Sequence, residues 1–463
     1  MSKGKKRPSR PELAPEPSPR SPSRWIRSWK IIVFVTVLIG GLVGFFANAL
    51  VVNAERARRA RAELAASLLR DVANYLAFGE VSEAKAALDS STIPSDAETS
   101  AEPDFQLAKD LTQGFADEQS QWDSDIPDKR TALRDHLKRL VVSTSPPIAA
   151  ELLALLSYRL PPSGGQVSTY VCPATYFHEH VSVFSTPYGR YLMARESHAS
   201  DPAWSRDILD KLVLDATLSG HCRLQLQIRA WLAKMCLHFD DFSCAHQQLD
   251  RTDELISECR VKDPTLEVRV RGESLRLARR ANLKDVRNKE RSLLSGITHR
   301  RERQEDIAAA TNAFLHLAVD SFYWRDYAAA KDEANSGHEL CETSANLRGN
   351  YPYACCMLAV FWTGSNLLLD APLPTTDQTL ETSATSLRGM SGGPFPSDES
   401  LVQLFLSLDA CRNGDPNKSS QNYYAKAMEY RTAALNDACG SRVFDYAEEW
   451  KIVEARLRHR QCL

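Results

Sequence analysis

Cysteine is scarce in this sequence and does not occur before Cys172. There are eleven cysteines in 463 residues. This content is far below that of small secreted domains that depend on cross-links, so burial of apolar side chains must hold most of the fold. Because eleven is odd, at least one thiol has no partner within a monomer.

The sequence also has little net charge. The formal charge is −2, so no protein-wide field attracts nucleic acid. The most basic stretch, residues 260–303, mixes its Arg and Lys side chains with acidic ones and has no aromatic residues that could stack on bases. We therefore expect no nucleic-acid partner. This stretch is typical of a solvated helix, or of a helix lying against lipid headgroups or an acidic partner.

Motifs of catalysis and cofactor binding are missing as well. There is no phosphate loop, no dinucleotide fingerprint and no metal-ligand spacing on a helix. The segment GMSGG at 389–393 matches the nucleophile-elbow pattern, but its flanks are typical of loops rather than of a strand and a helix. We expect no enzymatic activity and no cofactor.

What the sequence does contain is one long uncharged run, residues 31–52. As a helix it would be about 33 Å long at 1.5 Å per residue, enough to cross a hydrocarbon core of about 30 Å. It has no polar stripe, which a buried helix of a soluble protein normally has. The run predicts a transmembrane helix.

Basic residues flank this run on both sides but are more numerous before it. The positive-inside rule then places the N-terminus in the cytosol and the C-terminal part outside it. The alternative is a cleaved signal peptide, with ANA at 47–49 resembling a cleavage site. The run is longer than the apolar core of a signal, which favours a retained single-pass anchor in the lipid bilayer.

Gly40 and Gly44 form a G-x-x-x-G pattern within the run. Small residues one turn apart allow two membrane helices to approach closely. The pattern is therefore compatible with a homodimer in which two copies of this helix pack against each other.

Beyond the span, helical periodicity dominates and strand alternation is rare, so we predict an all-α fold. Residues 55–91 continue as a helix that Gly79 breaks. The expected organisation is a disordered basic tail (1–30), the span (31–52), a helical segment (53–159), an irregular insertion (160–202) and a helical repeat-like domain (203–463) with a disordered loop at 370–400.

Three stretches, 68–88, 229–249 and 314–334, share a helix–turn–helix pattern. In each, small or apolar residues precede a turn, and the second helix carries a small residue at a matched position: Ala84, Ala245 and Ala330. This spacing resembles the tetratricopeptide repeat. It departs from that family because Ala84, Ala245 and Ala330 follow no 34-residue period. The resemblance implies stacked antiparallel hairpins, an α-solenoid whose concave surface holds a peptide or a partner helix.

The segment MCLHFDDFSCAH, residues 235–246, concentrates two cysteines and two histidines. Cys236 and His238 are two apart, as are Cys244 and His246, so each pair would point to opposite sides of a helix, which disfavours zinc. Two disulfides, Cys236–Cys244 and Cys222–Cys259, would instead clamp a helical hairpin at both ends if the Cα atoms come within about 7 Å. Buried free thiols are the other alternative.

These observations favour a membrane-anchored scaffold or adaptor whose helical domain binds a protein or peptide. A membrane-bound sensor whose helical domain binds a ligand is the alternative. The N-terminal tail offers no output domain for such a sensor.

Overall fold

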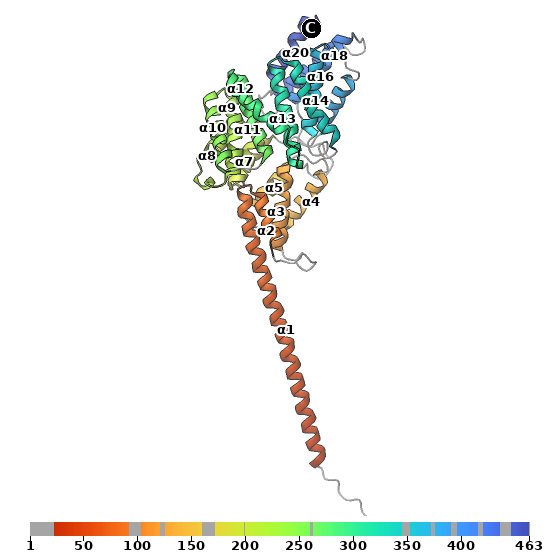
Figure 1. The fold of residues 1–463 in the computed structure, drawn as a ribbon. Helices are drawn as coiled ribbons and strands as arrows, with labels where there is room; N and C mark the ends of the chain where they lie inside the picture. Colours follow the sequence, from red (N-terminus) through yellow and green to blue (C-terminus); the bar gives the residue numbers. More distant parts are fainter. Residues whose placement is uncertain are drawn as a thin grey trace, which may run out of the picture. The chain divides into compact units, whose positions relative to one another are not determined.

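The structure is a computed structural model that describes residues 23–91, 103–120, 126–159, 172–198, 200–259, 263–344, 352–371, 376–389, 396–414, 420–435 and 446–462. The chain divides into two compact units, residues 1–64 and 65–463. All regular elements in the described residues are helices (Figure 1). The predicted all-α fold class is therefore confirmed.

The first helix, α1, covers Ser23–Ala77. Its part within the first unit is long and apolar enough to cross a membrane, and the apolar side chains of this part are exposed. The helix ends just before Gly79, as predicted, and Gly79 has a φ of +71°. A side chain there would also meet the ring of Tyr188, since an added Cβ would lie 2.7 Å from it. Of the predicted disordered tail, residues 1–30, positions 1–22 lie outside the described residues, whereas positions 23–30 belong to α1.

The remaining helices belong to the second unit. They are α2 (Val81–Asp89), α3 (Pro103–Ser120), α4 (Ile126–Leu140), α5 (Pro147–Arg159), α6 (Pro173–Glu179), α7 (Pro187–Ser197), α8 (Pro202–Val213), the 3₁₀ turn η2 (Ala216–Leu218), α9 (Cys222–His238), α10 (Phe242–Cys259), α11 (Pro264–Ala281), α12 (Lys284–Thr298), α13 (Gln304–Tyr323), α14 (Tyr327–Thr343), α16 (Pro352–Leu368), α17 (Thr376–Gly389), α18 (Pro396–Asn413), α19 (Ser420–Leu435) and α20 (Ala447–His459).

Two stretches that we expected to be irregular contain helices. The expected insertion at 160–202 holds α6 and α7, and the expected loop at 370–400 holds α17 and the start of α18. The reason is that several prolines here begin helices rather than break them. Pro187 follows the N-cap Thr186, whose hydroxyl accepts a hydrogen bond from the Gly189 amide at 3.0 Å.

One turn recurs where successive helices meet. A left-handed residue follows the first helix, and the next amide donates back to a carbonyl five residues earlier, as Asp241 does to Cys236 at 2.9 Å and Asp326 to Ser321 at 2.9 Å. The residues in this turn are Gly79, Asp240, Asn282, Arg325, Asp370 and Gln461, and Gly414 after α18 is also left-handed. Residues 240, 282, 325, 370 and 414 fall 42, 43, 45 and 44 positions apart. The structure thus contains a regular spacing that is longer than the 34 residues of a tetratricopeptide repeat.

The sequence pattern of small residues does not show this regular spacing, and the cause is local. Ala245 and Ala330 lie five residues after the left-handed residues of their turns, and both are fully buried. The same place after Asn282 holds Arg287, whose Nε donates to Asp320 at 2.8 Å. Because position 287 carries a charged side chain, the helix pair of residues 264–298 lacks the small residue that marks the pairs before and after it in the sequence.

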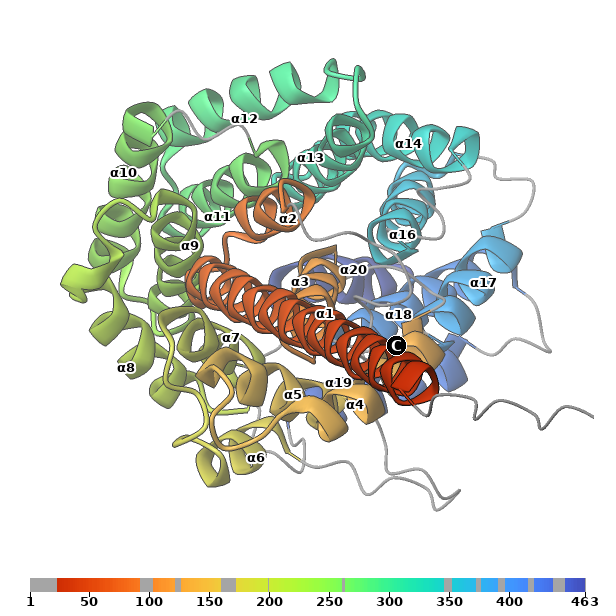
Figure 2. The ribbon, with the colours of Figure 1, turned by 90° about the horizontal axis from the view of Figure 1, so that it is seen from below.

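Helices that are neighbours in sequence pack against one another in pairs: α9 with α10, α11 with α12, α13 with α14, α16 with α17 and α18 with α19. The first helix of each pair also contacts the first helix of the next pair. We call α9, α11, α13, α16 and α18 the inner row. In Figure 2 these helices lie toward the inside of the second unit, whereas α8, α10, α12 and α17 lie toward its outside. This arrangement is compatible with a helical repeat.

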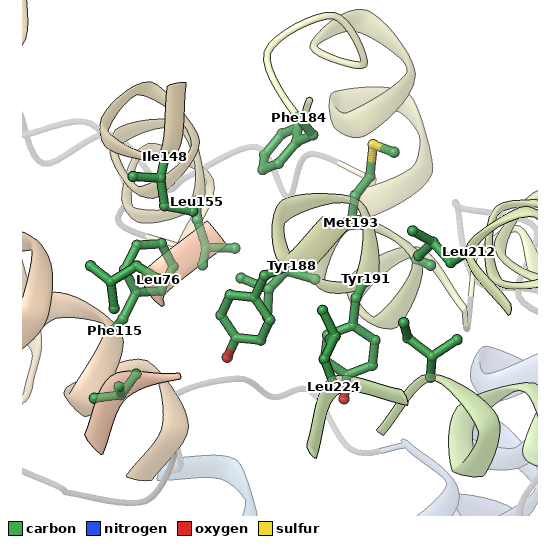
Figure 3. Close-up of a cluster of buried hydrophobic side chains, with 14 of the residues drawn as sticks. Leu76, Phe115, Ile148, Leu155, Phe184, Tyr188, Tyr191, Met193, Leu212 and Leu224 are labelled. Carbon is green, nitrogen blue, oxygen red and sulfur yellow. The ribbon is translucent and has the colours of Figure 1, made fainter. Parts of the chain in front are cut away.

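The N-terminal part of the second unit is held by a separate apolar cluster (Figure 3). Leu76 of α1 and Phe115 of α3 lie on one side of Tyr188 of α7, whose ring centre is 5.7 Å from that of Phe115. Leu212 of α8 and Leu224 of α9 complete the cluster. The part of α1 from residue 65 onward is therefore a core element of the second unit.

Two helical glycines provide a test of how closely the inner row packs. In α11, a Cβ added at Gly272 would lie 2.4 Å from Cε1 of His316 on α13, whereas nothing lies within 4 Å of one added at Gly296 of α12. We expect Gly272→Ala to lower the free energy of unfolding by about 1–3 kcal/mol because it overpacks this contact. The matched Gly296→Ala should raise it by about 0.5–1 kcal/mol through helix propensity. Denaturant unfolding of the full chain in detergent measures both, and equal shifts would contradict the packing described.

Candidate binding surface on the inner row

The C-terminal helix α20 packs differently from the helices before it. Helix α20 packs chiefly on α18, as each first helix packs on the first helix of the preceding pair, and its side chains contact Tyr424 and Arg431 of α19; unlike its neighbours it also contacts α13. In Figure 2, α20 lies in the interior of the second unit, beside α18. The inner row thus already holds one helix of this chain.

The contacts of α20 define its direction. The hydroxyl of Tyr446, just before α20, lies 3.2 Å from that of Tyr353 at the start of α16. At the other end, Arg456 donates to Asp370 at 2.9 Å, two residues beyond the end of α16, and Arg460 also pairs with Asp370. Helix α20 therefore runs in the same direction as α16 and alongside it.

One face of α20 is buried at helical spacing. Trp450, Val453 and Leu457 have no exposed surface. The Trp450 ring lies 6.2 Å from the ring of Tyr424 on α19, and the guanidinium of Arg431 lies over it at 5.0 Å. We call the residues that contact this helix the α20 contact surface: Arg279, Tyr353, Phe361, Asp370, Tyr424 and Arg431.

An ion pair anchors the first turn of α20. Oε1 of Glu449 lies 3.6 Å from Nη1 of Arg279 on α11, and the side chains of Glu449 and Arg279 are 6% and 12% exposed. Burial lowers the pKa of Arg279 and raises that of Glu449, since desolvation disfavours both charged forms. Among the described residues, Nη1 of Arg279 has no hydrogen-bond partner, so Glu449 is its main electrostatic compensation.

A neighbouring histidine is kept neutral by the same environment. Burial, followed by the positive charges of Arg279, Arg276 and Arg269, lowers the pKa of His316 to about 3. A second proton on this ring would add charge next to an arginine that already lacks full compensation. His316 therefore contributes packing on the inner row rather than a positive charge.

A cavity of about 510 Å³ adjoins the Arg279–Glu449 pair. Its walls come mainly from α9, α11 and α20, with single residues from α10, α13 and the end of α7. They carry four cationic side chains: Lys234, Arg276, Arg279 and Arg280. The acidic residues in the wall are Asp240, Glu448 and Glu449, two of which belong to α20. The helices of the inner row thus present positive charge to this space, and α20 supplies much of the negative charge that balances it.

The four cysteines considered either as two disulfides or as buried free thiols lie in α9 and α10. Cys222–Cys259 and Cys236–Cys244 are disulfides with Cα–Cα distances of 6.1 and 5.8 Å, and they join the two ends of this helix pair. Cys341–Cys355 links α14 to α16, and Cys411–Cys462 links α18 to the chain just after α20. We had not paired Cys411 with Cys462, because no local pattern connects positions 51 residues apart.

The alternative of a metal site meets a geometric obstacle. Ligand atoms of Cys236, Asp241 and Cys244 lie within 4.8 Å of one another, but both sulfurs belong to a disulfide. Asp241 accepts hydrogen bonds from the Cys244 amide and from Arg206. His246 pairs with Asp250 instead. Asp241 here acts as the N-cap of α10.

Gly40 and Gly44 lie on the exposed part of α1, with nothing within 4 Å of an added Cβ. The possible dimer contact at these residues remains a prediction. The GMSGG segment begins at the last residue of α17, Gly389, and its other residues lie outside the described part.

No family model matches this chain, and no curated protein sequence matches it. The described residues define a helical protein whose helices pack in neighbouring pairs, with one candidate membrane-spanning helix.

The buried ion pair can be tested with a double-mutant cycle. We expect Glu449→Gln alone to lower the free energy of unfolding by about 3–5 kcal/mol, because it leaves the buried Arg279 guanidinium uncompensated. Arg279→Met combined with Glu449→Gln should cost less than the sum of the two single replacements. Denaturant unfolding of each variant measures this, and fully additive effects would show that the two charges do not compensate each other.

Proposed function

We propose that this chain is a single-pass membrane protein whose helix pairs form a TPR-like α-solenoid outside the cytosol, and that it acts as a scaffold or adaptor. Its inner row binds a protein or peptide partner. The observation that carries this proposal is the seating of α20. The inner row holds a 13-residue helix through three fully buried apolar side chains and an ion pair.

The cavity beside α20 supports a binding role over a purely structural one. Its volume of about 510 Å³ lies within the range of ligand pockets, and its cationic side chains come from two neighbouring helices of the inner row. A partner segment with acidic side chains would find compensating charges there. No chemistry is required of the site, so the proposal needs no catalytic residue.

The proposed membrane anchor and the proposed compartment of the second unit are supported by different features. The apolar part of α1 supports a span, and the basic excess before residue 31 supports a cytosolic N-terminus. The four disulfides support an oxidising compartment for the second unit, because cytosolic thiols are kept reduced.

Thiol counting in intact membranes tests the compartment. The protein is denatured and alkylated before and after reduction, and its peptides are weighed. We expect the eight cysteines of the four disulfides to react only after reduction, and Cys172 and Cys356 to react before it. Immediate alkylation of all eleven cysteines would place the second unit in a reducing compartment.

Site-specific photo-crosslinking tests the binding function. A photoreactive residue is placed at His238 or Arg280, which line the cavity, and at Lys211 or Ser257, which are exposed on α8 and α10. In native membranes, we expect one adduct of constant mass from the cavity positions and none of that mass from the other two. Equal adducts from all four positions, or none from any, would contradict a partner on the inner row.

A further inference from the structure

The N-terminal part of the second unit contains a cavity that the proposed function does not use. Helices α3, α4 and α5 lie beside the C-terminal part of α1 (Figures 1 and 2). Residues of these four helices, with the loop before α5 and Thr186, line a cavity of about 740 Å³. We call it the α1–α5 cavity, and its volume is that of a pocket for one small ligand.

Helix α1 presents three alanines to this cavity, Ala66, Ala73 and Ala77. Small residues on one face of a helix normally permit another helix to approach closely. Here α3, α4 and α5 pack on one another, whereas none of the described helices packs closely along the backbone of α1. The alanines therefore widen a cavity instead of closing a helix contact.

Larger apolar side chains form the rest of the wall. Leu69 lies on α1, Leu107 on α3, Leu140 at the end of α4 and Ile148 at the start of α5. Three of them, Leu69, Leu107 and Ile148, belong to the apolar core of this part of the unit. Because displacing water from such a wall is favourable, the cavity suits an apolar group.

Two arginines add a preference for negative charge. Arg70 of α1 and Arg139 of α4 line the cavity, are exposed, and form no ion pair with any described residue. The acidic residue of the lining is Asp104, in the first turn of α3. The lining thus carries one positive charge more than negative charge, and a guanidinium donates well to a carboxylate.

The chain reaches this cavity soon after the candidate span. Ala66 follows Val52, the last residue of the uncharged run, by 14 positions. The residues between span and cavity, 53–64, contain four arginines and two glutamates. Such a basic stretch attracts anionic amphiphiles in a bilayer.

We propose that the α1–α5 cavity binds a long-chain fatty acid taken from the bilayer. The acyl chain occupies the apolar space beside the three alanines, and the carboxylate accepts hydrogen bonds from Arg70 and Arg139. A single acyl chain is held by a bilayer only weakly and reversibly, so it transfers to a protein site far more readily than a two-chain phospholipid. This inference goes beyond the scaffold function, because it concerns helices outside the inner row.

Photolabelling of the full chain tests the inference. The chain is placed in phosphatidylcholine nanodiscs without detergent, since detergents are themselves amphiphiles, and the probe is palmitic acid with a diazirine near the end of its chain. We expect label on peptides of α1 from residue 65 onward and of α5. Unlabelled palmitic acid should compete at least about tenfold better than hexadecanol, which lacks the carboxylate.

The position of the label separates binding from partition. Label confined to residues 31–52 would show that the fatty acid only dissolves in the bilayer around the span, and would overturn the inference. Equal competition by palmitic acid and hexadecanol would show that Arg70 and Arg139 do not recognise a carboxylate.

Charge variants test the two arginines. With Arg70→Gln and Arg139→Gln, half-maximal labelling of the cavity should need at least about tenfold more probe. The matched control, Lys85→Gln with Arg301→Gln, removes two exposed positive charges outside the cavity and should label like the parent chain. An equal loss in both pairs would mean unspecific attraction by net charge and reject the site.

Filling the cavity tests its apolar part with both arginines in place. Ala66 and Ala77 line the cavity and are only half-buried, so Ala66→Trp and Ala77→Leu extend into it without replacing a core residue. We expect both variants to lose label in the cavity while circular dichroism and the unfolding transition match the parent chain. Undiminished labelling of either folded variant would overturn the inference.

The two proposals can fail separately. Crosslinking from His238 and Arg280 without label in the α1–α5 cavity would leave the scaffold function in place and reject the fatty-acid site. Label in the cavity without any crosslinked partner would support the site and count against the scaffold function.

Discussion

The turn that follows each first helix is the constraint on which the second unit depends. A left-handed residue and one backbone hydrogen bond end the helix and set the direction of the next. Because this geometry recurs every 42 to 45 residues from Asp240 to Asp370, the first helices line up in one row. Arg325 is the least favourable member, since a residue other than Gly, Asn or Asp is destabilised by about 1–2 kcal/mol in this conformation.

The inner row in turn creates the environment of α20. Arg279 lies where α11 faces the interior, so its guanidinium loses water and needs a compensating charge. Glu449 provides that charge at the first turn of α20, and Trp450 fills the adjoining apolar space. Arg276 and Arg280 stay at the cavity, where a partner could contact them. Charge compensation thus links the packing of the domain to its proposed binding role.

Much of the helical content followed from local patterns, and the errors have local causes. The break at Gly79 and the small residues Ala245 and Ala330 were predictable because turn geometry and close helix contact restrict residue type. Within 160–202 and 370–400, α6, α7 and α18 begin at prolines, and local pattern does not tell a proline that starts a helix from one that ends it. The repeat spacing was missed because Arg287 stands where its neighbouring pairs have alanine.

The sequence alone determined the all-α fold class and the candidate membrane span, since helical periodicity and an uncharged run of sufficient length are local properties. It also indicated which cysteines could clamp α9 to α10, because those residues are close in the chain. The tertiary structure alone decided the approach of Arg279 to Glu449, of Cys411 to Cys462 and of α20 to the inner row. These contacts join positions 51 to 170 residues apart, and only the packing of the helices between them brings them together.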